Sequence, residues 1–215
     1  MPVGFDKLRR VNYLAHAYLS FDIPDIVTGN LISDFVKGKR KLDYPPVIRA
    51  GITLHRAIDT FTDGHPAIRQ AKSWFRADYG LYSAPLTDVA FDHFLAGDPL
   101  IFPTPADLAA FARHTYEQLT ANAGLFPDRF TRIFPFMRDQ DWFSGYRTKQ
   151  GIFAGFGGLA RRAAYMPDPG QACRLFELHY TALGDCYRVF FPELKDFALQ
   201  TLRQLQQDQQ TGNFG

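Results

Sequence analysis

The chain has 215 residues, of which 46% are hydrophobic and 21% charged, a balance typical of a globular protein that buries one large core. Lys and Arg number 24 against 22 Asp and Glu, which excludes a general nucleic-acid binder. The two cysteines, Cys173 and Cys186, are too few for a disulfide framework.

The N-terminus has no apolar segment of a signal peptide, and no apolar run reaches the ~20 residues that span a bilayer. We therefore expect a cytoplasmic protein without membrane contact.

Helical periodicity, interrupted by Pro and Gly, predicts an all-α protein. In chain order, helices are expected at 11–20, 22–36, 47–61, 67–79, 83–96, 104–122, 128–142, 145–162, 169–189 and 192–207. The basic run 37–41 is expected as a loop, and no alternating strand or repeat interrupts the pattern. The sequence thus predicts a single helical domain over 1–215, with 1–10 and the polar, Gln-rich tail 205–215 poorly ordered.

Four predicted segments carry polar residues four positions apart, and therefore on one helix face. The pairs are Asn12 and His16, Asn30 and Asp34, His55 and Asp59, and Asp88 and Asp92, with Asp63 one turn beyond Asp59. Imidazole and carboxylate groups are ligands for divalent metals, and several buried carboxylates without a cation would repel one another. A surface pair or a hydrogen-bonded core histidine is the alternative for each pair alone. His114 and His179 lack such a pattern and are not assigned a function.

The motifs resemble the acyl carrier protein phosphodiesterases over about 11–191, through the segments 12–16, 29–38, 51–59, 61–66, 92–96, 141–146, 151–152 and 159–162. The resemblance implies an all-helical fold related to the HD-domain phosphohydrolases. It also implies hydrolysis of the phosphodiester that joins 4′-phosphopantetheine to holo acyl carrier protein, with a divalent cation, usually Mn²⁺, although Mg²⁺ or another ion is possible.

The resemblance marks Asp34 as a residue important for activity and Asn30 as its neighbour one turn earlier. From it we hypothesise that Asp34, His55 and Asp92 bind the metal. Asp59 or His93 would be a further ligand or a base.

The residues around these candidates have more open roles. Arg56 would stabilise phosphate charge or pair with Asp63. We expect a supporting role, orienting the ligands, for Asn12, His16, Asn30, Asp63 and Asp88.

The basic residues Lys37, Lys39, Arg40 and Lys41 directly follow the Asp34 motif. They could dock an acidic carrier protein, or form an ordinary solvated loop. Two other functions stay open: an HD-like phosphohydrolase for a nucleotide or small phosphodiester, and a non-enzymatic carrier-binding module with a structural metal. No Gly-rich phosphate loop supports the nucleotide.

Overall fold

Helices make up every regular element of the computed structural model, which describes residues 12–163 and 165–211. The all-helical prediction is confirmed, whereas the N-terminal residues 1–10 lie outside the described part. The α-helices are α1 (Tyr13–Tyr18), α2 (Pro24–Ile32), α3 (Pro46–Gly64), α4 (Pro66–Tyr79), α5 (Ser83–Gly97), α6 (Pro105–Ala121), α7 (Asp128–Asp139), α8 (Trp142–Gly145), α9 (Lys149–Arg162), α10 (Pro169–Leu178) and α11 (Tyr180–Gln210). Short 3₁₀ turns lie at η1 (Ser33–Phe35), η2 (Gly38–Asp43), η3 (Gly80–Tyr82) and η4 (Ala123–Leu125).

Proline sets the start of five of these helices. It occupies the first turn of α2, α3, α4, α6 and α10, where its fixed φ suits the helix and its missing N–H costs no hydrogen bond. Thr104 and Asp107 add a reciprocal capping box at α6. These local signals explain why most helix starts could be read from the sequence.

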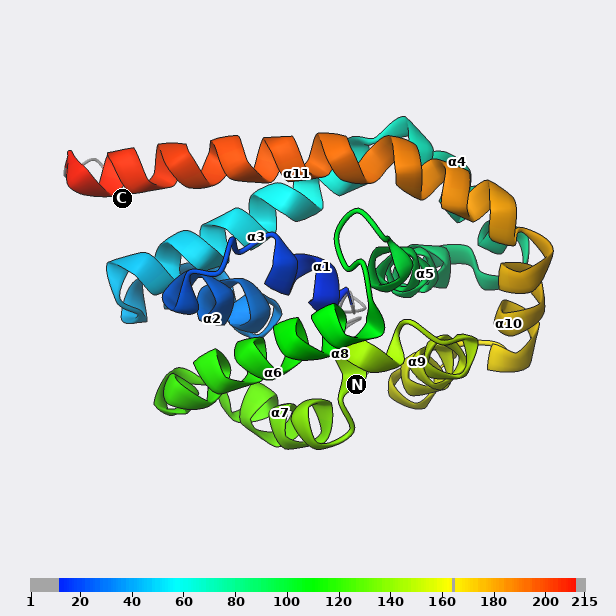
Figure 1. The fold of residues 1–215 in the computed structure, drawn as a ribbon, viewed down its shortest axis with the longest axis horizontal. Coiled ribbons are helices and arrows are strands. Elements are labelled where there is room, and N and C mark those ends of the chain that lie inside the picture. The colour runs from blue at the N-terminus through cyan, green and yellow to red at the C-terminus, as the bar shows by residue number, and fades with distance from the viewer. Residues whose placement is uncertain (1–11, 164, 212–215) are drawn as a thin grey trace, which may run out of the picture.

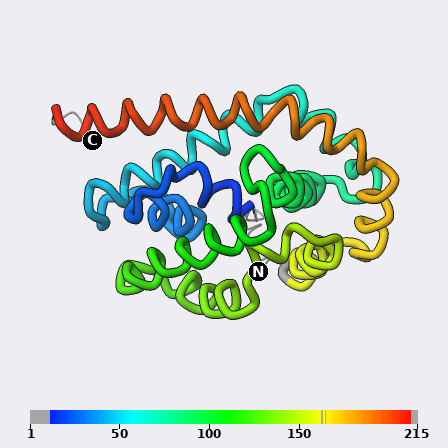
Figure 2. Tube along the Cα trace, in the orientation of Figure 1, coloured from blue at the N-terminus to red at the C-terminus, as the bar shows by residue number. Residues whose placement is uncertain are grey.

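The helices enclose one continuous apolar core, with the short α1 near the middle (Figures 1 and 2). The long α11 runs along one edge and packs on α3, α4 and α5, while α6, α7 and α8 lie on the opposite side. Five of the six residues of α1 are buried. His16 is one of them, so a polar ring is held inside the core.

Two glycines allow a close contact between α2 and α3. A Cβ atom on Gly51 would lie 2.6 Å from the Ile26 carbonyl oxygen and 2.9 Å from the Gly29 Cα, and one on Gly29 would meet the Ile48 carbonyl oxygen. Backbone atoms fill the space of a side chain at both positions. The contact places Asn30, next to Gly29, against His55, one turn after Gly51.

The C-terminal half differs from the predicted helices in two ways. The expected break at Pro192 is absent, because α11 continues through this residue; the break falls at His179, between α10 and α11. The helix bends along its course in Figure 1, as is usual for a helix with an internal proline. The helix expected over 128–142 instead ends at Asp139, and Asp141, at φ 43°, starts the short α8.

Residues 205–210 of the tail, expected to be poorly ordered, continue α11 as a helix. Leu205 is buried, and the Gln209 side chain donates to the Pro46 carbonyl oxygen across the fold (2.7 Å). A tertiary contact thus orders a segment whose composition alone predicts fraying. None of the helices in the described ranges combines the length and apolar character needed to cross a membrane.

We expect Gly51→Ala to lower the free energy of unfolding by about 2 kcal/mol or more, because its Cβ overlaps backbone atoms that cannot rotate away. Urea unfolding measures the change. Gly64→Ala on the same helix is the matched control, since its Cβ meets nothing within 4 Å, and its stability should be unchanged or slightly raised. A Gly51→Ala protein as stable as the wild type would contradict the glycine contact.

Candidate metal centre

Four side chains from three elements meet between α1, α3 and η1. His16 comes from α1, His55 and Asp59 lie one turn apart on α3, and Asp34 comes from η1. The Asp59 carboxylate lies 3.5 Å from the Nε2 atoms of both His16 and His55, and the Asp34 Oδ1 lies 3.5 Å from the His55 Nε2. One donor atom each from His16, His55 and Asp59 fits within 4.8 Å, so these three residues could hold one metal ion. We call the four residues the His–Asp cluster.

The cluster is buried on its histidine side and open on its carboxylate side. The side chains of His16 and His55 are 3% and 6% exposed, against 22% for Asp34 and 23% for Asp59. The two imidazole rings stack with centroids 4.0 Å apart. Solvent or a substrate can therefore approach past the carboxylates, whereas the rings are fixed by packing.

Asn30 fixes both histidines through one oxygen atom. Its Oδ1 lies 2.7 Å from the Nδ1 of His16 and 3.2 Å from the Nδ1 of His55. An amide oxygen can only accept, so both rings donate from Nδ1. Their Nε2 atoms then face the two carboxylates. This is the arrangement by which a partner on one ring nitrogen prepares the other nitrogen for a metal.

The Asn30 amide is itself held in orientation. Its Nδ2 donates to the His16 carbonyl oxygen and to the Ser20 Oγ, both at 3.0 Å, and the Ser20 hydroxyl donates to the same carbonyl at 2.8 Å. Both side chains are fully buried. Ser20 therefore belongs to the site, although nothing in the spacing of the polar pairs marked it.

The charges in the cluster are strongly coupled. Burial would lower the pKa of His55, but contacts with Asp34 and Asp59 outweigh it and raise this pKa to about 9. Burial and the neighbouring His55 lower the pKa of His16. Burial would raise the pKa of Asp59, but its contacts with the two histidines lower it. At neutral pH the cluster therefore holds a proton on His55 between two carboxylates.

A divalent cation fits this cluster on chemical grounds. The Nε2 atoms of His16 and His55 are buried and form no hydrogen bond within the described part of the chain. Buried nitrogen atoms rarely lack a partner, and here both point toward carboxylates. A cation between them would give each nitrogen a ligand bond and replace the proton on His55.

Asp92 lies outside the His–Asp cluster, although it was expected among the ligands. Its two carboxylate oxygens accept the backbone N–H groups of Leu14 (3.1 Å) and Ala15 (2.9 Å) at the start of α1. The residue is fully buried, and burial raises its pKa well above the ordinary value. In this position Asp92 holds the helix that carries His16.

His93 faces a different part of the molecule from its neighbour Asp92. Its Nδ1 donates to the Tyr146 carbonyl oxygen (2.8 Å), so its Nε2 accepts from the Tyr180 hydroxyl (2.9 Å). Burial lowers its pKa. Both ring nitrogens are engaged away from the cluster.

The other residues expected at the site make contacts of their own. Arg56 donates to the Val36 carbonyl oxygen (2.9 Å) and so ties α3 to the segment that follows Asp34, while Asp63 pairs with Lys72 instead of Arg56. Asp88 is buried on α5, one turn before Asp92. Asn12 begins α1, and its carbonyl oxygen accepts from the His16 N–H.

The basic run forms the 3₁₀ turn η2 rather than an irregular loop, with Gly38 at φ 56° permitting the turn. Lys37, Lys39 and Arg40 are exposed and Lys41 is half-buried. This places a cationic surface just after the η1 turn that carries Asp34.

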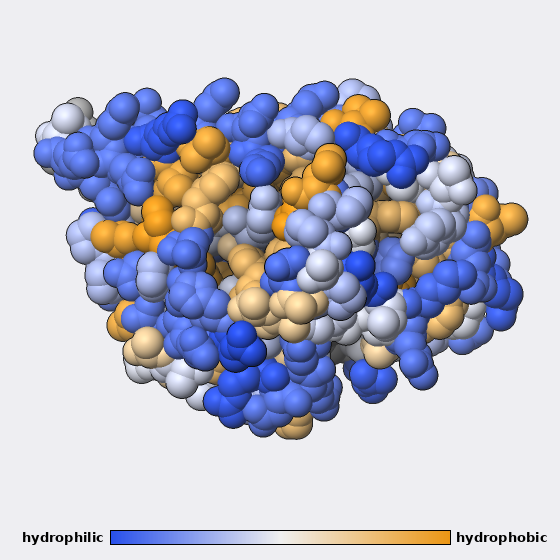
Figure 3. Space-filling model, viewed as in Figure 1, coloured by the Kyte–Doolittle hydropathy of each residue, from blue (hydrophilic) through white to orange (hydrophobic). Residues whose placement is uncertain are grey.

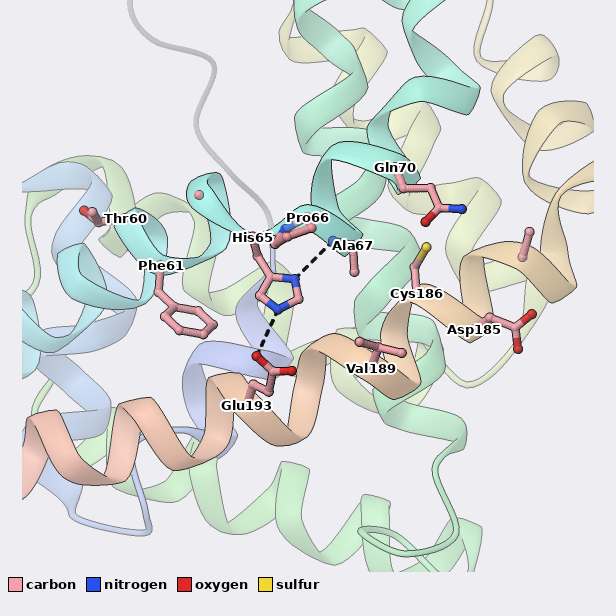
Figure 4. Close-up of a pocket in the computed structure, with 12 residues that line it drawn as sticks. Thr60, Phe61, His65, Pro66, Ala67, Gln70, Asp185, Cys186, Val189 and Glu193 are labelled. Carbon is pink, nitrogen blue, oxygen red and sulfur yellow. Dashed lines mark hydrogen bonds and ion pairs between the residues drawn. The ribbon is translucent and has the colours of Figure 1, made fainter.

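A separate hollow of about 790 Å³ lies between the α3–α4 junction and α11 (Figure 4). Its most buried polar group is His65, which caps α4 by accepting the Ala67 N–H and faces the Glu193 carboxylate at 3.2 Å. Phe61 and Cys186 point into the same space. His65 thus connects the start of α4 to α11. This structural role accounts for its hydrogen bonds, and no catalytic role is needed to explain them.

The fold and the His–Asp cluster together define an all-helical protein with a candidate site for a divalent cation. The model of the family described as acyl carrier protein phosphodiesterase matches residues 11–194. The chain therefore belongs to the acyl carrier protein phosphodiesterase family.

Curated relatives carry the same name. The acyl carrier protein phosphodiesterase of Yersinia pestis is 32% identical over 186 residues, which cover 86% of this chain and 95% of the relative. That of Salmonella paratyphi A is 30% identical over 184 residues, with the same coverage of both chains. No solved structure matches the chain.

We expect Asp59→Asn to weaken binding of Mn²⁺ at least about tenfold, because the amide cannot supply the negative charge that lies beside both histidines. Isothermal titration calorimetry on metal-free protein measures the affinity. Asp63→Asn, one turn further along α3 and paired with Lys72, is the matched control and should bind as the wild type does. Equal affinities in the two variants would remove Asp59 from the ligand set.

Proposed function

We propose that this protein is a metal-dependent phosphodiesterase that releases 4′-phosphopantetheine from holo acyl carrier protein and leaves the apo carrier. Family membership and the names of the relatives support this reaction class and substrate. The observation that carries the proposal is the pair of buried histidines that Asn30 holds with both Nε2 atoms toward carboxylates.

The ligand set that we propose is His16, His55, Asp59 and Asp34. This set includes His16, for which the sequence predicted only a supporting role. It omits Asp92, because both oxygens of that carboxylate accept backbone N–H groups at the start of α1. Mn²⁺ is the cation we favour, with Mg²⁺ as the alternative, since mixed imidazole and carboxylate sites suit borderline and hard cations. A bound cation would activate water and neutralise phosphoryl charge.

The chain's own residues then have distinct tasks. Asn30 and Ser20 keep the imidazole rings in one tautomer and orientation. The partly exposed carboxylates of Asp34 and Asp59 face the side from which a phosphodiester can approach. Arg56 uses one guanidinium nitrogen on Val36, so its remaining N–H groups can stabilise phosphate charge.

Two other functions remain as alternatives. An HD-like enzyme for a nucleotide or small phosphodiester would use the same cluster, so only substrate assays separate it from the proposal. A carrier-binding module with a structural metal fits less well. Structural sites are closed, whereas two carboxylates of this cluster are more than a fifth exposed.

We expect holo acyl carrier protein incubated with the protein and Mn²⁺ to lose about 340 Da, the mass of one phosphopantetheine group, through attack of an activated water. Intact-protein mass spectrometry follows the loss, and a chelator should prevent it. Asp34→Ala should slow the reaction at least about a hundredfold, whereas Asp78→Ala, exposed on α4, should not. Folded Asp34→Ala protein with wild-type turnover would refute the role of Asp34. No loss with several divalent metals would redirect the search to nucleotides and small phosphodiesters.

The basic turn η2 is our proposed dock for the acidic carrier. We expect charge reversal of Lys39, Arg40 and Lys41 to raise KM for the carrier about tenfold while lowering kcat less, because exposed charges guide encounter rather than chemistry. Steady-state kinetics at low and high salt measures the effect, and salt should raise the wild-type KM as well. Reversal of Arg132 and Arg203, exposed on other helices, is the control. A KM insensitive both to reversal and to salt would exclude docking at η2.

A further inference from the structure

A second pocket, of about 850 Å³, opens between the end of α5, the loop that follows it and α11. It shares no residue with the His–Asp cluster. Figure 3 shows hydrophobic side chains at the boundary between α11 and this loop. Its walls are mostly aromatic and aliphatic: Phe94, Leu100, Ile101, Tyr180, Tyr187 and Phe191.

Most polar groups in this pocket are already engaged with one another. His93 accepts from the Tyr180 hydroxyl at 2.9 Å, and the Tyr187 hydroxyl donates to Asp98 at 3.0 Å. Arg188 pairs with the exposed Asp185. The two tyrosine hydroxyl protons are thus used within the protein, and the charge of Arg188 is balanced by Asp185.

Two cations in the pocket lack a carboxylate partner within the described ranges. Arg147 is half-buried, and its one hydrogen-bond acceptor in the described part of the chain is the Ala96 carbonyl oxygen (2.9 Å). Lys195 is half-buried, with its ammonium 5.3 Å from the centre of the Tyr18 ring. Two half-buried, uncompensated cations beside apolar walls favour an anion over water.

The chemistry of the lining also limits the body of the ligand. Among the residues that the structure describes, no Asn, Gln, Ser or Thr lines the pocket. A sugar or a nucleotide base would leave its polar edges without partners against these walls, whereas a hydrocarbon would not.

We propose that this pocket binds an amphipathic organic anion, with a carboxylate or phosphate head held by Arg147 and Lys195 and a hydrocarbon body against the aromatic walls. The site is independent of the phosphodiesterase reaction proposed above. It gives the pocket beside His93 a binding role.

The test is calorimetric titration of the full chain with decanoate, with a chelator present so that binding through a metal is excluded. Decyl phosphate and decanoate should both bind, and the tighter of the two identifies the head group. Decanol and inorganic phosphate should each bind at least about tenfold more weakly, because each offers only half of the contacts. Decanol binding as tightly as decanoate, or no binding of either amphiphile, would overturn the proposal.

Two variants locate the site. Lys195→Gln should weaken decanoate binding about fivefold or more, against no change for Arg203→Gln, which lies exposed on the same helix. Leu100→Asp places a negative charge at the rim, on a side chain that is 93% exposed and so not needed for folding, and should weaken binding similarly. Leu81→Asp, 79% exposed elsewhere, is its control. Wild-type affinity in both Lys195→Gln and Leu100→Asp would place decanoate outside this pocket.

Discussion

The glycine contact between α2 and α3 is the constraint on which the candidate metal centre depends. With no side chain at Gly29 or Gly51, the two backbones approach until Cα atoms and carbonyl oxygens fill the space of a Cβ. At this separation the short Asn30 side chain of α2 reaches the Nδ1 atom of His55 on α3 while it also contacts the Nδ1 atom of His16 on α1. A larger residue at either glycine would move the amide away from His55, so the packing of α2 on α3 and the orientation of this ring are set by one contact.

Asn30 also links the electrostatics of the cluster to its geometry. Because its amide oxygen takes the Nδ1 protons, the Nε2 atoms are left to the carboxylates, and the pKa of His55 rises to about 9 through Asp34 and Asp59. The proton on His55 occupies the position that a divalent cation would take. Cation binding should therefore release a proton at neutral pH, whereas in the metal-free cluster the protonated His55 offsets part of the carboxylate charge.

The sequence could predict much of this arrangement, because the relevant signals are local. Helix type, proline starts and the face shared by His55 and Asp59 follow from periodicity and spacing. The sequence could not predict in the same way which polar residues enter the His–Asp cluster and which only hold a helix in place. Asp92 has the spacing of a ligand, yet it accepts backbone N–H groups of α1, and His16 lies among the cluster residues. Which of these residues joins the cluster depends on the contact between α1 and α5, where Leu14 and Asp92 are 78 positions apart in the sequence. The continuous α11 has the same origin: buried neighbours on both sides of Pro192 outweigh the local signal.

Helices α1 and α5 connect the His–Asp cluster to the pocket beside His93. On α5, Asp92 holds the start of α1, while the next residue, His93, faces the aromatic pocket. On α1, His16 lies in the His–Asp cluster, while Tyr18 packs on Phe191 and lies beneath Lys195 at the pocket. Binding of a cation by the cluster would require rigid helices, because metal ligands must stay within a fraction of an ångström of one geometry. A ligand filling the pocket would hold α1 and α5 from the other side. Helices α1 and α5 thus lie between the cluster and the pocket, although the two share no residue.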